Sequence, residues 1–144
     1  MASRTRVVVT GIGVVSSVGI GAEAFWSAIL AGRSGISTVE SFDSSRYAVH
    51  TGGEVKHFDP RAFIEHLPPT GIARASQLAI AAARLALRDA ALDPAGLDPL
   101  TCGVSMGTTS GEPSMVEHFN DLEMASRRQD LGPEFIEQYP CHVL

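Results

Sequence analysis

The chain has few cysteines and no long hydrophobic run. Its 144 residues include only Cys102 and Cys141, which is too few for the disulfide framework of a small secreted domain. We therefore expect a reducing, cytoplasmic setting. No apolar stretch is long enough to cross a bilayer, so we expect no association with a membrane.

Basic charge is also scarce, which argues against a nucleic-acid-binding protein. The formal net charge is -5 at pH 7, whereas a protein that binds nucleic acid or an anionic membrane needs a positive surface. The histidines show none of the spacings typical of metal ligands, such as H-x-x-x-H or Cys-x-x-Cys. The sequence therefore predicts no metal site and no cofactor.

The N-terminal stretch allows two interpretations. Two arginines, the apolar residues 7–20 and the sequence Ala22-Glu23-Ala24 could form a secretory signal with its cleavage site. Glycine recurs between Gly11 and Gly21, however, and a glycine-rich run is a poor helix former. A folded segment is therefore favoured over a signal.

The segment from Arg6 to Gly19 reads RVVVTGIGVVSSVG. A run of Val, Val, Val and Thr is typical of a buried strand, which we expect over residues 6–10. Gly11 and Gly13 permit a tight turn and a close approach of another backbone. The segment thus predicts a first strand that ends at a compact turn under a helix.

Three helices are predicted in the first two thirds of the chain. The first covers Ala22–Ala31, with Gly32 as a left-handed C-cap. A short helix is expected over Asp59–His66, because Asp-Pro is an N-cap followed by proline at the first helical position. The strongest helix covers Ile72–Leu92 and has one thin polar stripe. Its remaining alanine-rich surface predicts that protein surrounds it and that other backbones approach it closely.

A second buried strand is predicted over Cys102–Met106, and a weaker one over Thr51–Val55. A polar loop then leads into a helix that carries Phe119 and Leu122 on one face. The alternation of strands and helices predicts an α/β fold with parallel pairing.

A dinucleotide site is one hypothesis for the glycine turn. Residues 11–16, GIGVVS, match the first two glycines of G-x-G-x-x-G, but Ser16 stands at the third position. The acidic residue that should follow about 20 residues later could only be Glu40, within a loop. A packing turn is therefore favoured, and an NAD(P)-dependent oxidoreductase stays a remote alternative.

The remaining candidates for chemistry are a loop and two thiols. The loop Gly107–Glu112 follows a strand and could hold an anion with its N–H groups, but it lacks the lysine of a P-loop. It is better interpreted as a pocket wall at the carboxyl end of a strand. Cys102 is expected to be an inert core thiol. Cys141 adjoins His142, but sequence neighbours do not face each other, so no nucleophilic dyad is expected.

Five blocks of sequence, taken in order, are more specific than any of these motifs. They are RVVVTGIGVVSSVG, FWSAILAGRSGIS, FDSSRYAVHTGGEVKHFDP, RASQLAIAAARLALRDA and CGVSMGTTSGE. Together they resemble the start of a β-ketoacyl-acyl carrier protein synthase, of the elongating type II fatty acid or polyketide kind. The resemblance implies a thiolase-like α/β fold with α-β-α-β-α layers. Residues 1–144 would form an incomplete N-terminal half of that domain, in which the glycine turn binds no nucleotide.

The resemblance also implies an activity, a decarboxylative Claisen condensation of an acyl thioester with malonyl-carrier protein. In similar enzymes a cysteine carries the acyl chain and two histidines assist it. All three lie later than the position that corresponds to Leu144. We therefore expect no catalytic residue within residues 1–144, which would be truncated before the nucleophile motif and inactive alone.

The residues that the resemblance assigns to substrate lie in the glycine-rich loop: Gly107, Thr108, Ser110 and Gly111. They match the mouth of the acyl pocket. Ser110 stands where fatty acid enzymes have an apolar gating residue, and this departure leaves the acyl preference open.

The resemblance further implies partners. An acyl carrier protein with a phosphopantetheine-linked acyl chain would dock on Arg74, Arg127 and Arg128, although the stretch LPPTGIARA is less basic than in similar enzymes. The protein would form a homodimer, or a heterodimer with a ketosynthase-like subunit. A chain-length-factor-like subunit, which shares the fold but lacks the cysteine, is the alternative function.

Overall fold

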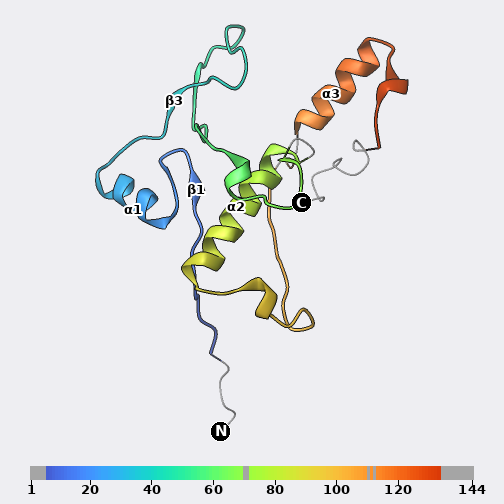
Figure 1. Ribbon diagram of the computed structural model, residues 1–144. Coiled ribbons are helices and arrows are strands. Elements are labelled where there is room, and N and C mark those ends of the chain that lie inside the picture. The colour runs from blue at the N-terminus through green and yellow to red at the C-terminus, as the bar shows by residue number, and fades with distance from the viewer. Residues whose placement is uncertain (1–5, 70–71, 110, 112, 134–144) are drawn as a thin grey trace. The chain divides into compact units, whose positions relative to one another are not determined.

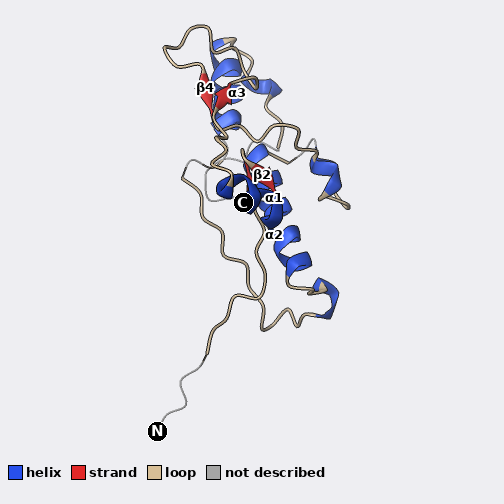
Figure 2. Ribbon diagram, turned by 90° about the vertical axis from the view of Figure 1, so that its left-hand side faces the viewer, coloured by secondary structure: helices blue, strands red, loops and turns tan. Residues whose placement is uncertain are grey.

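The structure is a computed structural model that describes residues 6–69, 72–109, 111 and 113–133 (Figure 1). These residues fall into two units. The first joins the residues up to Asp59 with Ala81–Leu97, and the second joins Pro60–Ile80 with the residues from Asp98 onward. Most of the described chain outside the α-helices is loop, as the colours of Figure 2 show.

The first unit begins with an extended segment that turns back in a short hairpin. Strand β1 (Val15–Ser16) pairs antiparallel with β2 (Gly19–Ile20). The N–H of Gly21 then donates to the carbonyl of Val14 at 2.8 Å. Gly21 has a φ of +90°, a conformation that glycine adopts without steric cost. The chain can therefore leave the hairpin and enter a helix at the next residue.

A second hairpin in the same unit is fastened by one carboxylate. Strand β3 (Ser37–Thr38) pairs antiparallel with β4 (Thr51–Gly52). The Glu54 carboxylate accepts hydrogen bonds from the backbone N–H groups of Glu40 at 2.8 Å and Ser41 at 2.9 Å. The two strands are very short, so these two bonds extend the connection between them beyond the ladder.

The three α-helices in the described part of the chain end in the same backbone motif. In each, the first residue past the C-cap adopts the left-handed conformation, and two N–H groups bond back to carbonyls of the last turn, which is the Schellman arrangement. The predicted left-handed cap at Gly32 is confirmed. The left-handed residues are Gly32 (φ 63°), Ala91 (φ 52°) and Ser126 (φ 56°). The helices are α1 (Ala22–Leu30), α2 (Arg74–Asp89) and α3 (Pro113–Met124).

The glycine turn packs directly against the alanine-rich surface of α2. A β-carbon at Gly11 would lie 2.7 Å from the β-carbon of Ala90, and one at Gly13 would lie 2.6 Å from the backbone nitrogen of Ala86. The carbonyl oxygens of Ala86 and Ala82 would be closer still. Only glycine permits so close an approach, which confirms the predicted role of the two glycines and of the alanines.

The second unit contains α3 and two 3₁₀ turns. The 3₁₀ turns η1 (Pro60–Ala62) and η4 (Arg128–Asp130) flank its helical parts in sequence. The side chain of Gln77 donates from Nε2 to the carbonyls of Pro69 at 2.9 Å and Ile72 at 2.7 Å, which ties the start of α2 to the preceding loop. Of the helix expected over Asp59–His66, the structure forms only the 3₁₀ turn η1.

The two strands expected to be buried are instead exposed and unpaired. Val7 is 92% exposed and Val104 is 89% exposed, and neither residues 6–10 nor residues 102–106 join a ladder within the described part of the chain. The ladders found there are the two antiparallel hairpins, not a parallel sheet. Strand β4 also covers only the first two residues of the strand expected over 51–55. A strand needs a neighbour to accept its hydrogen bonds, and these segments find none among the described residues.

We predict that Gly13→Ala destabilises the full-length protein. The added β-carbon overlaps the backbone of α2, and overpacking of this kind costs about 1–3 kcal/mol. The measurement is the free energy of unfolding in urea. The matched control is Gly96→Ala at the end of η3 (Pro94–Gly96), where a β-carbon meets no atom within 4 Å. Equal stabilities of the two variants would contradict the close packing of the glycine turn.

Residues 1–144 produced alone are expected not to unfold cooperatively. Burying one aliphatic side chain contributes about 1.5–3 kcal/mol, whereas ordering each residue's backbone costs about 1–2 kcal/mol. In the described part of the chain few apolar residues are buried, and no large side chain is fully buried. A single sharp thermal transition by near-UV circular dichroism would refute the expectation. The buried apolar residues are Ala28, Ile64, Ala81 and Leu122.

Candidate functional site

The glycine-rich loop follows the exposed segment 102–106 and leads into α3. The N–H of Gly111 donates to Oγ1 of Thr108 at 3.1 Å. Gly111 is buried and has a φ of +61°, which a side chain would strain. The structure therefore brings Thr108, which follows Gly107, into hydrogen-bond contact with Gly111. Ser110, the predicted gating position, lies outside the described residues.

The two predicted docking arginines at the end of α3 are both engaged in ion pairs. Nε of Arg127 lies 2.6 Å from Oδ2 of Asp130. Arg128 pairs with Glu123, and its guanidinium carbon lies 5.8 Å from the centre of the Phe119 ring. Both arginine side chains are mostly exposed, at 62% and 68%. They form one surface with the end of α3.

Arg74, the third predicted docking residue, lies on another element. It is the first residue of α2 and its side chain is exposed. The structure therefore places two of the three docking candidates side by side and the third at a helix start.

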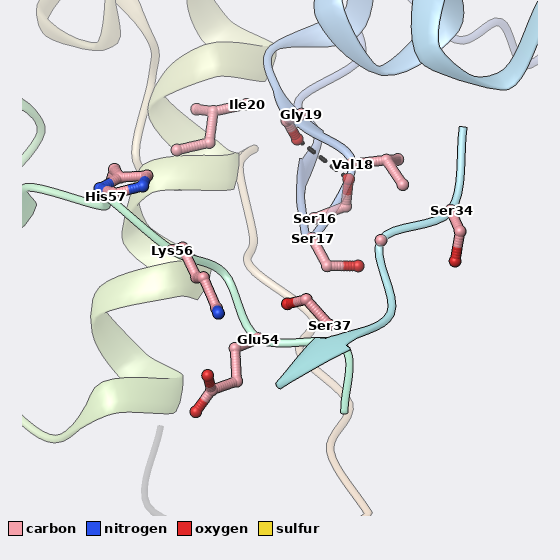
Figure 3. Close-up of a pocket in the computed structure, with 11 residues that line it drawn as sticks. Ser16, Ser17, Val18, Gly19, Ile20, Ser34, Ser37, Glu54, Lys56 and His57 are labelled. Carbon is pink, nitrogen blue, oxygen red and sulfur yellow. Dashed lines mark hydrogen bonds between the residues drawn. The ribbon is translucent and has the colours of Figure 1, made fainter. Parts of the chain in front are cut away.

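The first unit contains a pocket that the sequence did not predict (Figure 3). It has a volume of about 490 Å³ and is lined by three segments that lie apart in sequence. Within its wall, Ser16 Oγ donates to the carbonyl of Gly19 at 2.9 Å. Its lining is rich in serine hydroxyls and carries two oppositely charged side chains. The lining residues are Ser16, Ser17, Val18, Gly19, Ile20, Ser34, Gly35, Ser37, Glu54, Lys56 and His57.

The charged groups of this pocket are already used by the protein. Nζ of Lys56 donates to the carbonyl of Thr38 at 2.8 Å and to Oε1 of Glu40 at 2.6 Å. Hydrogen bonds from the Ser41 side chain and from the backbone N–H groups of Glu40 and Ser41 lower the pKa of Glu54. These contacts hold the β3–β4 hairpin, so the charges have a structural use. The SGIS and VSSVG blocks supply the hydroxyls, but no spacing in the sequence indicates that they meet.

The glycine turn does not form a dinucleotide site. In the dinucleotide-binding fold a helix begins at the glycines and directs its N–H groups at the phosphates. Here the β1–β2 hairpin follows the turn, and α1 begins only at Ala22. The N–H of Ile12, between the two glycines, donates instead to Oδ2 of Asp89 on α2 at 2.8 Å. The interpretation of GIG as a packing turn is therefore the one that the structure supports.

The two cysteines were the remaining candidates for chemistry. Cys102 is exposed in this structure, so its predicted role as a core thiol is wrong here, because the strand around it has no covering layer among the described residues. Cys141 lies outside the described residues. Within the described part of the chain no cluster of three or more metal-binding side chains occurs. The helices in that part are also too short or too polar to cross a membrane.

The whole chain matches one family. The sequence model of the β-ketoacyl synthase N-terminal domain covers residues 4–143, and the chain belongs to that family. The tetracenomycin polyketide synthase ketoacyl synthase alpha subunit of Streptomyces glaucescens is 45% identical over 109 residues, which are 74% of this chain and 25% of that protein. The beta subunit of the same synthase is 39% identical over 141 residues, which are 96% of this chain and 33% of that protein.

A solved structure shares the fold. The ishigamide ketosynthase/chain length factor superposes with a TM-score of 0.87 at 35% identity, over 96% of this chain and 34% of that one. This confirms the expected thiolase-like α/β class, with the chain as a part of the fold. The 3-oxoacyl-[acyl-carrier-protein] synthase 2 of Vibrio cholerae is 32% identical over 134 residues, 93% of this chain and 32% of that protein. The chain therefore spans between a quarter and a third of the length of these relatives.

We predict a pH dependence for the Glu54 contact. Because the folded-state pKa of Glu54 is lowered, its stabilising effect is fully present above the ordinary glutamate pKa and is lost as the pH falls through the lowered value. In the full-length protein, hydrogen exchange at the N–H groups of Glu40 and Ser41 should be slow near neutral pH and lose protection in acid. Glu54→Gln should weaken that protection near neutral pH and remove its loss in acid, because the neutral amide resembles the protonated carboxyl at every pH. Glu23→Gln on α1 serves as the control. Unchanged protection in Glu54→Gln would contradict the role of the carboxylate.

Proposed function

We propose that the chain is the N-terminal part of a β-ketoacyl synthase that joins an acyl thioester to malonyl-carrier protein by decarboxylative condensation, in fatty acid or polyketide synthesis. The observation that carries the proposal is the family match across residues 4–143, with 45% identity to a ketoacyl synthase alpha subunit. The five sequence blocks in order support it, because they include the loop to which a substrate role is assigned.

In this proposal the residues of the chain bind and position, and do not react. Thr108 and Gly111, which are joined by a hydrogen bond, form part of the mouth of the acyl pocket, with Gly107 and Ser110. Arg74, Arg127 and Arg128 contact an acyl carrier protein. The nucleophilic cysteine and both histidines belong to the part of the domain that follows residue 144, so residues 1–144 alone are inactive.

A chain-length-factor-like subunit is the second candidate. The tetracenomycin beta subunit aligns with more of this chain than the alpha subunit does, 96% against 74%, and the ishigamide structure is a ketosynthase/chain length factor. In this case the protein would pair with a ketosynthase-like subunit in a heterodimer and would carry no nucleophile.

Covalent acylation of the full-length protein separates the two candidates. The protein, alone and with a co-produced partner subunit, is incubated with an acyl thioester and measured by intact mass spectrometry. A synthase gains the mass of one acyl group, because a thiolate displaces the carrier thiol, and Cys→Ala at the nucleophile position after residue 144 abolishes the gain.

The opposite outcome is equally specific. A protein that gains no acyl mass, and whose following sequence has no cysteine after a Thr-Ala-like turn, would overturn the synthase proposal and favour the non-catalytic subunit. The Cys102→Ala variant is the control, since this exposed thiol should not carry the acyl group.

A further inference from the structure

The two arginines that follow α3 are placed by the way the helix ends. Ser126 adopts a left-handed conformation with a φ of 56°, and its N–H donates to the carbonyl of Glu123 at 3.0 Å. The N–H of Arg127 donates back to the carbonyl of Leu122 at 2.7 Å. Since Leu122 is buried, this Schellman turn is anchored in the unit. It reverses the chain and returns both arginines to the last turn of the helix.

Two carboxylates meet the arginines there. Glu123, on the last turn of α3, pairs with Arg128, and Asp130 pairs with Nε of Arg127 at 2.6 Å. Arg128 also lies over the ring of Phe119, with 5.8 Å between the guanidinium carbon and the ring centre, an attraction that keeps the cation against the helix. The two arginines and the two carboxylates that pair with them therefore sum to zero formal charge.

The ion pairs are weak enough to be exchanged. All four charged side chains are substantially exposed, with Asp130 at 39% and Glu123 at 44%, and exposed pairs contribute little because water screens them. Both pairs use the Nε atom of the arginine. The internal carboxylate therefore occupies the edge of the guanidinium at which a carboxylate from another molecule can bind by two parallel hydrogen bonds, through Nε and one further nitrogen.

We propose that Glu123 and Asp130 are internal counter-ions that compete with an acidic carrier protein for Arg127 and Arg128, and so limit the strength of docking. The inference rests on the proposed function, because it takes the partner to be a carrier protein that presents carboxylates. Docking then exchanges one carboxylate for another at each arginine. No covalent bond is made or broken, and the internal acids hold both guanidinium groups in place until the partner arrives.

The test measures the dissociation constant of the full-length protein for a phosphopantetheinylated acyl carrier protein, by fluorescence anisotropy at low and high salt. Glu123→Gln and Asp130→Asn should each tighten binding about two- to fivefold at low salt, as expected when an exposed ion pair no longer competes. The matched control is Glu117→Gln, which removes the same charge from an exposed position of the same helix. It should tighten binding less. Arg128→Ala should weaken binding and remove the effect of Glu123→Gln.

Two results would overturn the inference. Equal effects of Glu123→Gln and Glu117→Gln would mean that only the overall charge matters, and unchanged binding in Arg128→Ala would mean that the carrier protein docks elsewhere. The acylation measurement decides the proposed function separately. A protein that is acylated but shows either result keeps its function and loses this inference. A protein that neither is acylated nor binds the carrier protein loses both.

Discussion

The first unit depends on one close contact, that of the Gly11–Gly13 turn with the alanine surface of α2. Two segments separated by about seventy residues in sequence meet backbone to backbone there. Because one segment has glycine and the other has alanine at the contact, the two backbones approach as closely as two polypeptide segments can. The hairpin β1–β2 and helix α1 follow directly from this turn, so their position is set by it.

The sequence predicted features that depend on single residues better than features that depend on neighbours. Gly32 was correctly expected as a helix C-cap, and Gly11 and Gly13 as points of close approach, because each is a local steric requirement. The strands over residues 6–10 and 102–106 were wrong as buried elements. Their composition is that of strands, but burial and pairing are properties of the segments beside them.

The candidate site shows the same division. Turn chemistry at Gly111 and exposure of the arginines could be expected from residue types, whereas the ion pairs of Arg127 and Arg128 could not. They arise because Ser126, which is not a residue that favours a left-handed conformation, nevertheless adopts one. The serine-lined pocket was missed for a related reason, since three short segments of unrelated sequence form it.

Because the chain reverses at the end of α3, the length of this helix decides on which side of it Arg127 and Arg128 lie. An α-helix turns by about 100° for each residue, since it has 3.6 residues per turn. Inserting or deleting one residue between Pro113 and Met124 would leave both arginines in the sequence and the Schellman turn intact. It would nevertheless rotate the turn, and everything attached to it, to a different side of the helix. The number of residues in α3 therefore fixes the direction of the arginines, which no single side chain of the helix does.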